Sequence, residues 1–441
     1  MSLINTLRKI SQSKNVVIAL YILAILFISL RNLTLPWGDL FADGGNYSHY
    51  NNYIIFKQSF FHLLQHKDLY IHYPLEQYDL FKYPPTFALL FAPFSLLPDL
   101  LGYTLWTTLN MMLPIFAISR ISDIANLGKI LFSILLLLEG FTSALNSQSN
   151  GLVLGLLLLA FVAMQRGRVT QAVIFIWLTA FIKLFGVLFF AMLWVFPNGF
   201  KKSLIRIPTV FALLFLLPWP ILGWNGLLNQ YHWMFNLLAH DHGYFVKYSV
   251  MGWLQQWFGL RPDKNLILFV GLCLQVLPFL FLFFKQKLWL LGSLQRMDHL
   301  QLTRWQFLYA GSWLLWMVIF NHMAESATYV IAVGGALFTL AFLAFDVNLD
   351  SEGSQNISLS SPENSQWFER IFCAMRRQKL RGPMIISLVF MIVFTMLGPT
   401  DIYPKQLRLW IVETAQLKAF PCILLWDILL FEMFKWRKMD T

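Results

Sequence analysis

The chain has 441 residues, of which 58% are hydrophobic and only 12% charged, against about 25% charged in an average soluble domain. A water-soluble fold of this size cannot hide so much apolar surface, so the composition excludes a soluble protein and predicts an integral membrane protein. The net charge of +11 does not indicate nucleic-acid binding. The basic residues stand in short clusters between apolar stretches, which is typical of cytoplasmic loops.

A helix that crosses the hydrocarbon core needs about 20 mostly apolar residues. The first such run follows Arg8, Lys9 and Lys14, but no small-residue cleavage site comes after it, so we interpret it as an uncleaved span. The sequence predicts an all-α polytopic membrane protein that forms a single membrane domain over 1–441. About twelve spans are expected, with eleven or thirteen as alternatives. The predicted spans lie near 15–31, 100–119, 130–146, 150–165, 169–182, 184–197, 204–223, 265–284, 305–321, 326–346, 384–399 and 417–434.

The lysine and arginine residues predict the orientation of these spans. With both termini inside, the cytoplasmic segments carry 22 of the 33 basic residues, as the positive-inside rule requires. Residues 86–98 are too short to span and are bounded by prolines, so we expect a re-entrant or interfacial helix there. Counting this segment as a full span would reverse every later loop and remove the charge bias.

Three segments between the spans are long. The first outer loop covers 32–98, including the short helix, and a second outer loop covers 224–264. The polar stretch 347–383 predicts a cytoplasmic linker. The three cysteines show no spacing typical of a disulfide scaffold or a zinc site. We therefore place the chemistry in the outer loops.

Ionisable residues within or beside the spans are costly and are usually paired or functional. Lys183 at a span end suits a lipid-linked phosphate, although a lysine snorkelling to the interface is an equal alternative. His322 and Glu325 are three residues apart and would share a face of a helix, either to handle an acceptor sugar or as a satisfied pair. Glu139, deep within its span, is expected to pair with a basic or amide group of a neighbouring helix.

The outer loops also carry a series of short motifs in a fixed order. Asp43 precedes a Gly-Gly pair, whose flexible backbone would let the carboxylate project over the bilayer surface. The alternative is that Asp43 is a solvated acid that caps the next helix. The motifs that follow are Asp68-Leu69-Tyr70, Lys82-Tyr83-Pro84-Pro85, Leu96-Leu97-Pro98, Trp106 with Asn110, Gln148-Ser149-Asn150, Ala180-Phe181-Ile182-Lys183 and Asn321-His322-Met323-Ala324-Glu325. This order resembles that of the polyprenol-phosphate-mannose-dependent mannosyltransferases of the GT-C class. Each motif is weak alone, but the series covers most of the chain.

The resemblance implies a GT-C-like bundle that transfers a sugar, most simply mannose, from a polyprenyl-phosphate donor to a glycolipid or glycan acceptor at the outer leaflet. It implies no cofactor and no metal, because the leaving group is a single phosphate. A carboxylate would take the proton of the acceptor hydroxyl, and cationic and histidine groups would stabilise the leaving phosphate. The residues implied are Asp43, His322 and Glu325 for catalysis and His49, Asn52, Tyr83, Gln148, Asn150 and Lys183 for substrate binding.

Two departures from the family pattern leave alternatives open. Ser147 stands where the family usually has glycine. At the head of the first loop helix, where the family has its acid, this chain has His49 or Asn52. Asp43 is the candidate replacement, and a base elsewhere or a loss of activity are the alternatives. One rival function is a transporter or flippase for a lipid-linked saccharide, which would predict inverted repeats and polar groups near the bilayer midplane. A second rival is another enzyme of the GT-C class, either an oligosaccharide ligase or a transferase that uses another hexose or a pentose.

Overall fold

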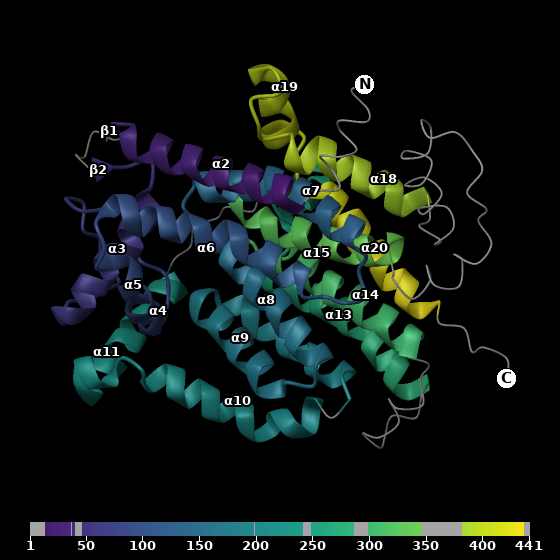
Figure 1. Cartoon of the computed structure of the whole chain (residues 1–441), viewed down its shortest axis with the longest axis horizontal. Helices are drawn as coiled ribbons and strands as arrows, with labels where there is room; N and C mark the ends of the chain where they lie inside the picture. The colour runs from purple at the N-terminus through teal and green to yellow at the C-terminus, as the bar shows by residue number, and fades with distance from the viewer. Residues whose placement is uncertain are drawn as a thin grey trace. The chain divides into compact units, whose positions relative to one another are not determined.

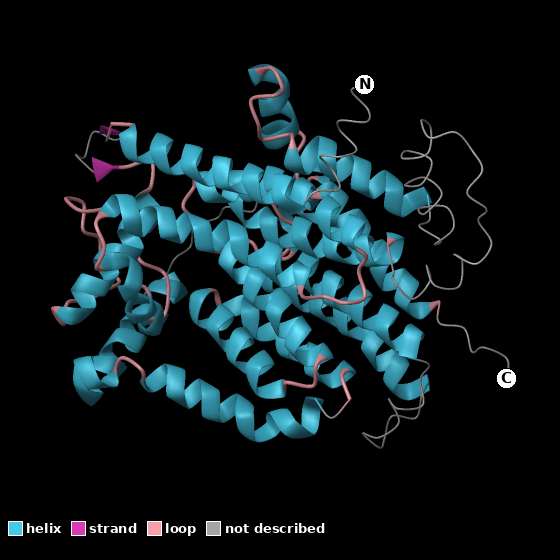
Figure 2. Ribbon diagram, in the orientation of Figure 1, coloured by secondary structure: helices cyan, strands magenta, loops and turns pink. Residues whose placement is uncertain are grey.

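The structure is a computed structural model, and it describes residues 14–36, 38–39, 46–197, 199–240, 248–285, 299–345 and 382–435. Within these ranges the chain is almost wholly helical, and the strands are a single two-residue pair, β1 (Gly38–Asp39) with β2 (Asn46–Tyr47) (Figure 2). The predicted class, an all-α polytopic membrane protein, is confirmed. Asp43 lies outside the described residues, as does the predicted linker as far as residue 381.

The chain divides into two compact units. One unit comprises Leu20–Ala117 and Gly140–Tyr244, and we call it the first-loop unit. Besides β1 and β2 it contains most of α2 (Lys14–Thr34), then α3 (Asn51–Leu64), α4 (Pro85–Leu90), α5 (Ala92–Ser95), α6 (Asp99–Ser119), α8 (Asn150–Gln165), α9 (Val169–Ile182), the 3₁₀ helix η1 (Leu184–Val195), α10 (Gly199–Leu216) and α11 (Trp219–His240) (Figure 1).

The other unit comprises Met1–Ala19, Ile118–Glu139 and Phe245–Thr441, and we call it the late unit. It contains most of α7 (Asn126–Leu145), then α12 (Val250–Phe258), α13 (Lys264–Lys285), α14 (His299–Ile319), η3 (Ser326–Thr328), α15 (Tyr329–Ala344), α18 (Gly382–Phe390), the π-helical η5 (Met391–Met396), α19 (Lys405–Leu409), the π-helical η6 (Trp410–Thr414) and α20 (Phe420–Phe434).

Each predicted span coincides with helical residues, but not every helix is long enough to cross a membrane alone. In the described part of the chain five helices have the length and apolarity of a span, namely α2, α6, α7, α13 and the run Ser326–Ala344. The helices α10 and α11 form a sixth candidate. The other predicted spans are shorter or more polar helices. The chain is therefore a multi-pass membrane protein, and the count of about twelve crossings stays a prediction.

The helices differ in how much of their apolar surface is covered. In α15 every residue is buried, and in α8 nearly every residue is. In the most apolar 18-residue stretch of each helix, only 22% of the residues of α13 and 33% of those of α2 are buried. A helix that is apolar all round belongs in a core, whereas apolar side chains left uncovered in a membrane protein face lipid. The cores of the two units thus form around α8 and around α15.

Prolines and glycines set the breaks in the helices. Pro85 opens α4, and the whole segment from Pro85 to Ser95 forms two helices of six and four residues, too short to span. The helices α10 and α11 meet at an angle of 96° after Pro218, and Gly223 at φ 66° kinks α11. The predicted span 204–223 contains this bend, so as one straight helix it is wrong.

Candidate active site

The turn between α7 and α8 is held in place by the two side chains singled out on α6. The indole Nε1 of Trp106 donates to the carbonyl of Ser147 over 3.1 Å. The side chain of Asn110 accepts a hydrogen bond of 2.9 Å from the backbone N–H of Leu152 and donates one of 3.0 Å to the carbonyl of Trp106. The Trp–Asn pair therefore fixes the position of residues 146–150.

Ser147 itself adopts φ 55°. This left-handed conformation costs a non-glycine residue roughly 1–2 kcal/mol, a cost that glycine would avoid. The Oγ of Ser147 lies 3.2 Å from the hydroxyl of Tyr103, which also accepts a 2.7 Å hydrogen bond from the amide of Asn32. Ser147 in this conformation is thus part of a polar network that includes Tyr103 and Asn32.

Gln148 and Asn150 lie within this turn and at the start of α8, and both side chains are buried. Next to them, Gly151 brings α8 so close to the backbone of Asn110 that a Cβ would clash with its carbonyl. The sequence predicted substrate binding for both residues. Their observed position shows that they shape a tightly packed turn, and the binding role stays a prediction.

The first helix of the outer loop reaches the same turn. The amide Nδ2 of Asn52 in α3 donates to the carbonyl of Asn146 over 2.8 Å. His49 lies in the turn before α3, with its ring edge-on to Tyr47 at 5.9 Å between centroids. Neither residue of this pair supplies a carboxylate. The replacement base predicted by the sequence, Asp43, lies outside the described residues.

Asp68 organises a local turn. Its carboxylate accepts a 2.8 Å hydrogen bond from the backbone N–H of Tyr70, and its carbonyl accepts one of 2.8 Å from the hydroxyl of Tyr73. The hydroxyl of Tyr70 then donates to the carbonyl of Tyr83 over 2.9 Å. Burial raises the pKa of Tyr70 well above its ordinary value, so this hydroxyl remains a donor. The Asp-Leu-Tyr motif therefore positions Tyr83.

Tyr83 and Lys183 are two predicted substrate-binding residues that the structure brings together. Lys183 ends α9 in an extended conformation, and its Nζ lies 6.0 Å from the centroid of the Tyr83 ring. This distance permits a cation–π contact. Lys183 is half-buried, between α9 and η1. A positioned ammonium group at this point suits an anionic ligand.

The sequence did not single out two side chains of α11 that join it to the first loop. Gln230 donates to the carbonyl of Lys67 over 2.6 Å and accepts from the N–H of Leu69 at 3.3 Å. The hydroxyl of Tyr231 lies 3.1 Å from Thr86 Oγ1 in α4. The sequence does not indicate which residues Gln230 and Tyr231 contact, because their partners lie more than 140 residues away along the chain.

His322 and Glu325 belong to the late unit, in a turn between α14 and η3. The expectation of a shared helix face is therefore wrong for this pair. Glu325 is exposed and forms a capping box with Thr328: its carboxylate accepts from the Thr328 N–H, and its own N–H donates to Thr328 Oγ1 over 3.3 Å. The carboxylate thus has a structural task at the start of η3, and a catalytic role stays a prediction.

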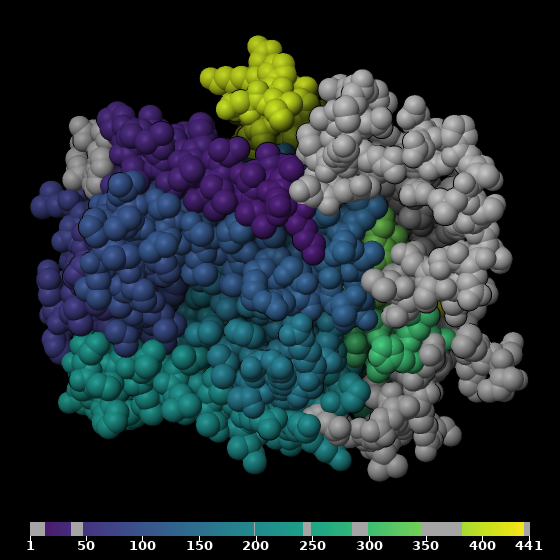
Figure 3. Space-filling model, viewed as in Figure 1, coloured from purple at the N-terminus to yellow at the C-terminus, as the bar shows by residue number. Residues whose placement is uncertain are grey.

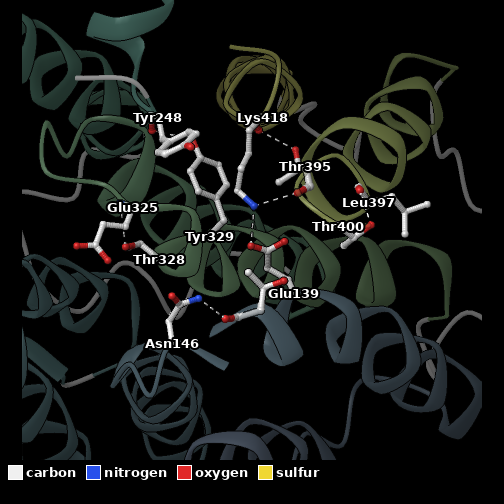
Figure 4. A network of polar contacts seen from close by, with 11 residues as sticks. Glu139, Asn146, Tyr248, Glu325, Thr328, Tyr329, Thr395, Leu397, Thr400 and Lys418 are labelled. Carbon is white, nitrogen blue, oxygen red and sulfur yellow. Dashed lines mark hydrogen bonds and ion pairs between the residues drawn. The ribbon is translucent and has the colours of Figure 1, made fainter. Parts of the chain in front are cut away.

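The partner of Glu139 is Lys418. Their Oε1 and Nζ atoms lie 2.8 Å apart, and both side chains are fully buried in the late unit. Lys418 also donates to the carbonyl of Thr395 over 3.0 Å, and its Nζ lies 5.1 Å from the centroid of the Tyr329 ring (Figure 4). The hydroxyl of Tyr329 donates to the carbonyl of Tyr248 over 2.8 Å. The predicted pairing of Glu139 is confirmed.

Comparison with known proteins gives one family match. Residues 81–293, just under half of the chain, match the model of Glycosyltransferase family 87. The matched range contains Tyr83, the α7–α8 turn and Lys183. It confirms the predicted enzyme class: the chain is a glycosyltransferase.

The solved structures that resemble the chain include two forms of one protein. ArnT from Cupriavidus metallidurans bound to undecaprenyl phosphate shows a TM-score of 0.36 and 13% identity, covering 96% of this chain and 78% of ArnT. The apo form of the same ArnT shows a TM-score of 0.40 and 14% identity, covering 94% and 76%. No curated protein matches the sequence.

Proposed function

We propose that the chain is an inverting, metal-independent glycosyltransferase with a GT-C-like bundle. It transfers a sugar, mannose being the first candidate, from a polyprenyl-phosphate donor to a lipid-linked or glycan acceptor. The reaction takes place on the outer side of the cytoplasmic membrane, with both termini inside. The observation that carries this proposal is the family match over residues 81–293, which encloses the contact between Tyr83 and Lys183.

Lys183 is the residue proposed to receive the donor phosphate. Its ammonium group lies against the face of an aromatic ring, which restrains it without neutralising it. Tyr83 is itself positioned through the Tyr70 hydroxyl. As the bond between the anomeric carbon and the phosphate oxygen breaks, negative charge grows on the leaving phosphate, and a fixed cation stabilises that charge.

Asp43 is the proposed base. The acceptor oxygen forms the new bond to the anomeric carbon from the face opposite the phosphate, its proton passes to the carboxylate, and polyprenyl phosphate leaves. Glu325 is the second candidate. Its carboxylate already accepts the N–H of Thr328, which favours Asp43.

The test is a transfer assay on the purified chain. Polyprenyl phosphates carrying radiolabelled mannose, glucose or arabinose are each incubated with the protein and a membrane lipid extract, with and without EDTA. We expect a labelled product from one donor, formed equally in EDTA, with the opposite anomeric configuration. Absence of product from every donor, together with movement of the labelled lipids across proteoliposome membranes, would instead establish the transporter.

A matched pair of variants locates the site. Lys183→Gln keeps a polar side chain and removes its charge, so it should lower transfer by about 10² or more, as expected for a lost electrostatic contact to the transition state. Lys201→Gln removes an equal charge from an exposed position and should leave transfer unchanged. Equal losses in both variants would contradict the assignment of Lys183.

A further inference from the structure

An open cavity of about 260 Å³ lies where α9 begins and α10 runs past it. Its walls include three basic side chains, Arg168 just before α9 and Lys202 and Arg206 in α10, together with the polar Thr170 and Gln171. All five belong to the first-loop unit. Basic groups from two separate elements thus converge on one hollow.

Among the described residues, no carboxylate pairs with the basic side chains of this cavity. No aspartate or glutamate occurs anywhere from residue 140 to residue 240, whereas the same stretch holds six lysine and arginine residues. Two further basic residues, Arg166 and Lys201, stand next to the cavity residues in the sequence and make the local potential more positive.

The local geometry adds to this potential. Lys202 and Arg206 are four residues apart on α10, where like charges face each other and repel. Arg168 occupies the N-cap of α9 and offers no side-chain acceptor to the first turn of that helix, whose N–H groups carry partial positive charge. An anion in the cavity would reduce the repulsion between Lys202 and Arg206 and would also interact with the positive N-terminus of α9. Guanidinium groups are suited to bind phosphate oxygens.

We propose that this cavity binds the phosphate group of an anionic membrane phospholipid. A lipid is favoured over a free anion because the neighbouring surface of α10 is apolar: Leu204, Ile205 and Leu213 are 57%, 78% and 66% exposed. These side chains extend an uncovered apolar surface along the same helix that carries Lys202 and Arg206. The teal α10 segment lies at the surface of the space-filling view in Figure 3. A bound lipid would place its head group in the cavity and its chains against this surface.

This site is separate from the proposed donor site. Arg168 and Lys183 stand at opposite ends of α9, and a rise of 1.5 Å per residue puts their backbones about 22 Å apart. The lipid proposed here is therefore not the sugar donor held at Lys183. Its binding would stabilise the α9–α10 pair, in which the indole Nε1 of Trp177 already donates to the carbonyl of Ile207 over 2.9 Å.

The experiment measures lipid binding to the full chain in detergent micelles. Phosphatidylglycerol, phosphatidylcholine and inorganic phosphate are titrated separately, and retention is followed by native mass spectrometry and by the unfolding midpoint. Wild-type protein should retain phosphatidylglycerol in preference to phosphatidylcholine. Lys202→Gln and Arg206→Gln should each weaken phosphatidylglycerol binding about fivefold, and the double variant about 25-fold.

Matched controls separate this site from general surface charge. Lys201→Gln and Arg166→Gln remove neighbouring exposed charges that do not line the cavity, and binding should stay within about twofold of wild type. Lys202→Arg should retain binding. An equal loss in Lys201→Gln, or inorganic phosphate competing as well as the lipid does, would overturn the proposal. The unfolding midpoint in phosphatidylcholine, unchanged in all variants, shows that each one folds.

Discussion

The carboxylate of Glu139 and the ammonium of Lys418 are in contact across 279 residues of sequence, and neither is exposed to solvent. Placing two charges in a dry interior is costly, and their attraction offsets the cost only when the geometry is good and further hydrogen bonds complete it. Lys418 meets this condition with the Thr395 carbonyl and the Tyr329 ring. The pair ties α7 to the segment that leads into α20.

Removing one member of this pair should be far more damaging than removing both. Glu139→Gln leaves Lys418 as a buried charge without its counter-ion and should cost about 3–5 kcal/mol of stability. The double variant Glu139→Gln with Lys418→Met removes both charges and should recover most of that loss. Thermal unfolding of the purified variants in detergent gives the comparison. Equal stability of the single and the double variant would mean that the charges do not interact.

Asp43→Asn tests the proposed base. The substitution keeps the shape of the side chain and removes its basicity, so transfer should fall by about 10² to 10⁴ with normal expression. Asp39→Asn, four residues closer to α2, is the control and should be nearly silent. His322→Ala should lower activity through substrate placement and recover partly at high acceptor concentration. If Asp43→Asn keeps more than half of the activity while Glu325→Gln has none, the base is Glu325.

The α7–α8 turn should depend on the Trp106 indole. Trp106→Phe keeps an aromatic ring but leaves the buried Ser147 carbonyl without its 3.1 Å hydrogen bond, at a cost of about 1–3 kcal/mol. Ser147→Gly should be tolerated, because glycine adopts φ 55° without strain. Ser147→Val should be poorly tolerated, because a β-branched side chain resists that conformation. The unfolding midpoint of Ser147→Gly should lie nearest to that of wild type, and the midpoints of Trp106→Phe and Ser147→Val should both lie lower.

His62 should make the first loop sensitive to acid. Burial lowers the pKa of His62 below 6.5, and the Glu76 carboxylate, 2.9 Å away, opposes this only in part. The folded state therefore binds the proton less readily than the unfolded chain does. Neutral His62 thus contributes its full share to the free energy of unfolding above pH 6.5, and this contribution declines as the pH falls below that value. The unfolding midpoint should drop between pH 7.5 and pH 5. His62→Gln should reduce that drop, whereas His72→Gln, at an exposed position, should not.

The orientation is testable with single cysteines in a background without native cysteine. Leu75 and Ile402 are 82% and 66% exposed, so Leu75→Cys and Ile402→Cys should react with an impermeant maleimide added to sealed cells. Lys201→Cys, also at an exposed position, should react only after the membrane is opened. Labelling of Lys201→Cys from outside would reverse the proposed topology. Ser48 and Ser203 are unsuitable positions for such probes because both are buried.

The helical segments could be predicted from the sequence because each one is a continuous apolar run. The runs around α8 and α9, at 150–165 and 169–182, match the observed bounds. The bend between α10 and α11 could not be predicted from the sequence, because Pro208, Pro218 and Pro220 each permit a kink. Only the packing determines at which of them the helix bends. The sequence likewise indicated that Glu139 needs a partner but not that the partner is Lys418.

The candidate site was predictable in its residues but less so in their tasks. Trp106 and Asn110 stood out as a motif, and only their hydrogen bonds show that they hold the α7–α8 turn. Glu325 looked like an acid for catalysis, although a Glu-x-x-Thr spacing at a helix start is also a capping pattern. Ser147 shows the reverse case, since a departure from glycine in the sequence corresponds directly to a backbone angle in the structure.

The complete burial of α15 has a consequence for how the late unit assembles. Its residues are apolar on every side, so the helix can enter the bilayer on its own and must then exchange all of its surrounding lipid for protein. The close approach of α14 rests on Gly311 and Gly335, where a Cβ would strike the facing helix and where association depends on packing more than on the hydrophobic effect. Detergents that insert between α14 and α15 should therefore dissociate this unit before they unwind either helix.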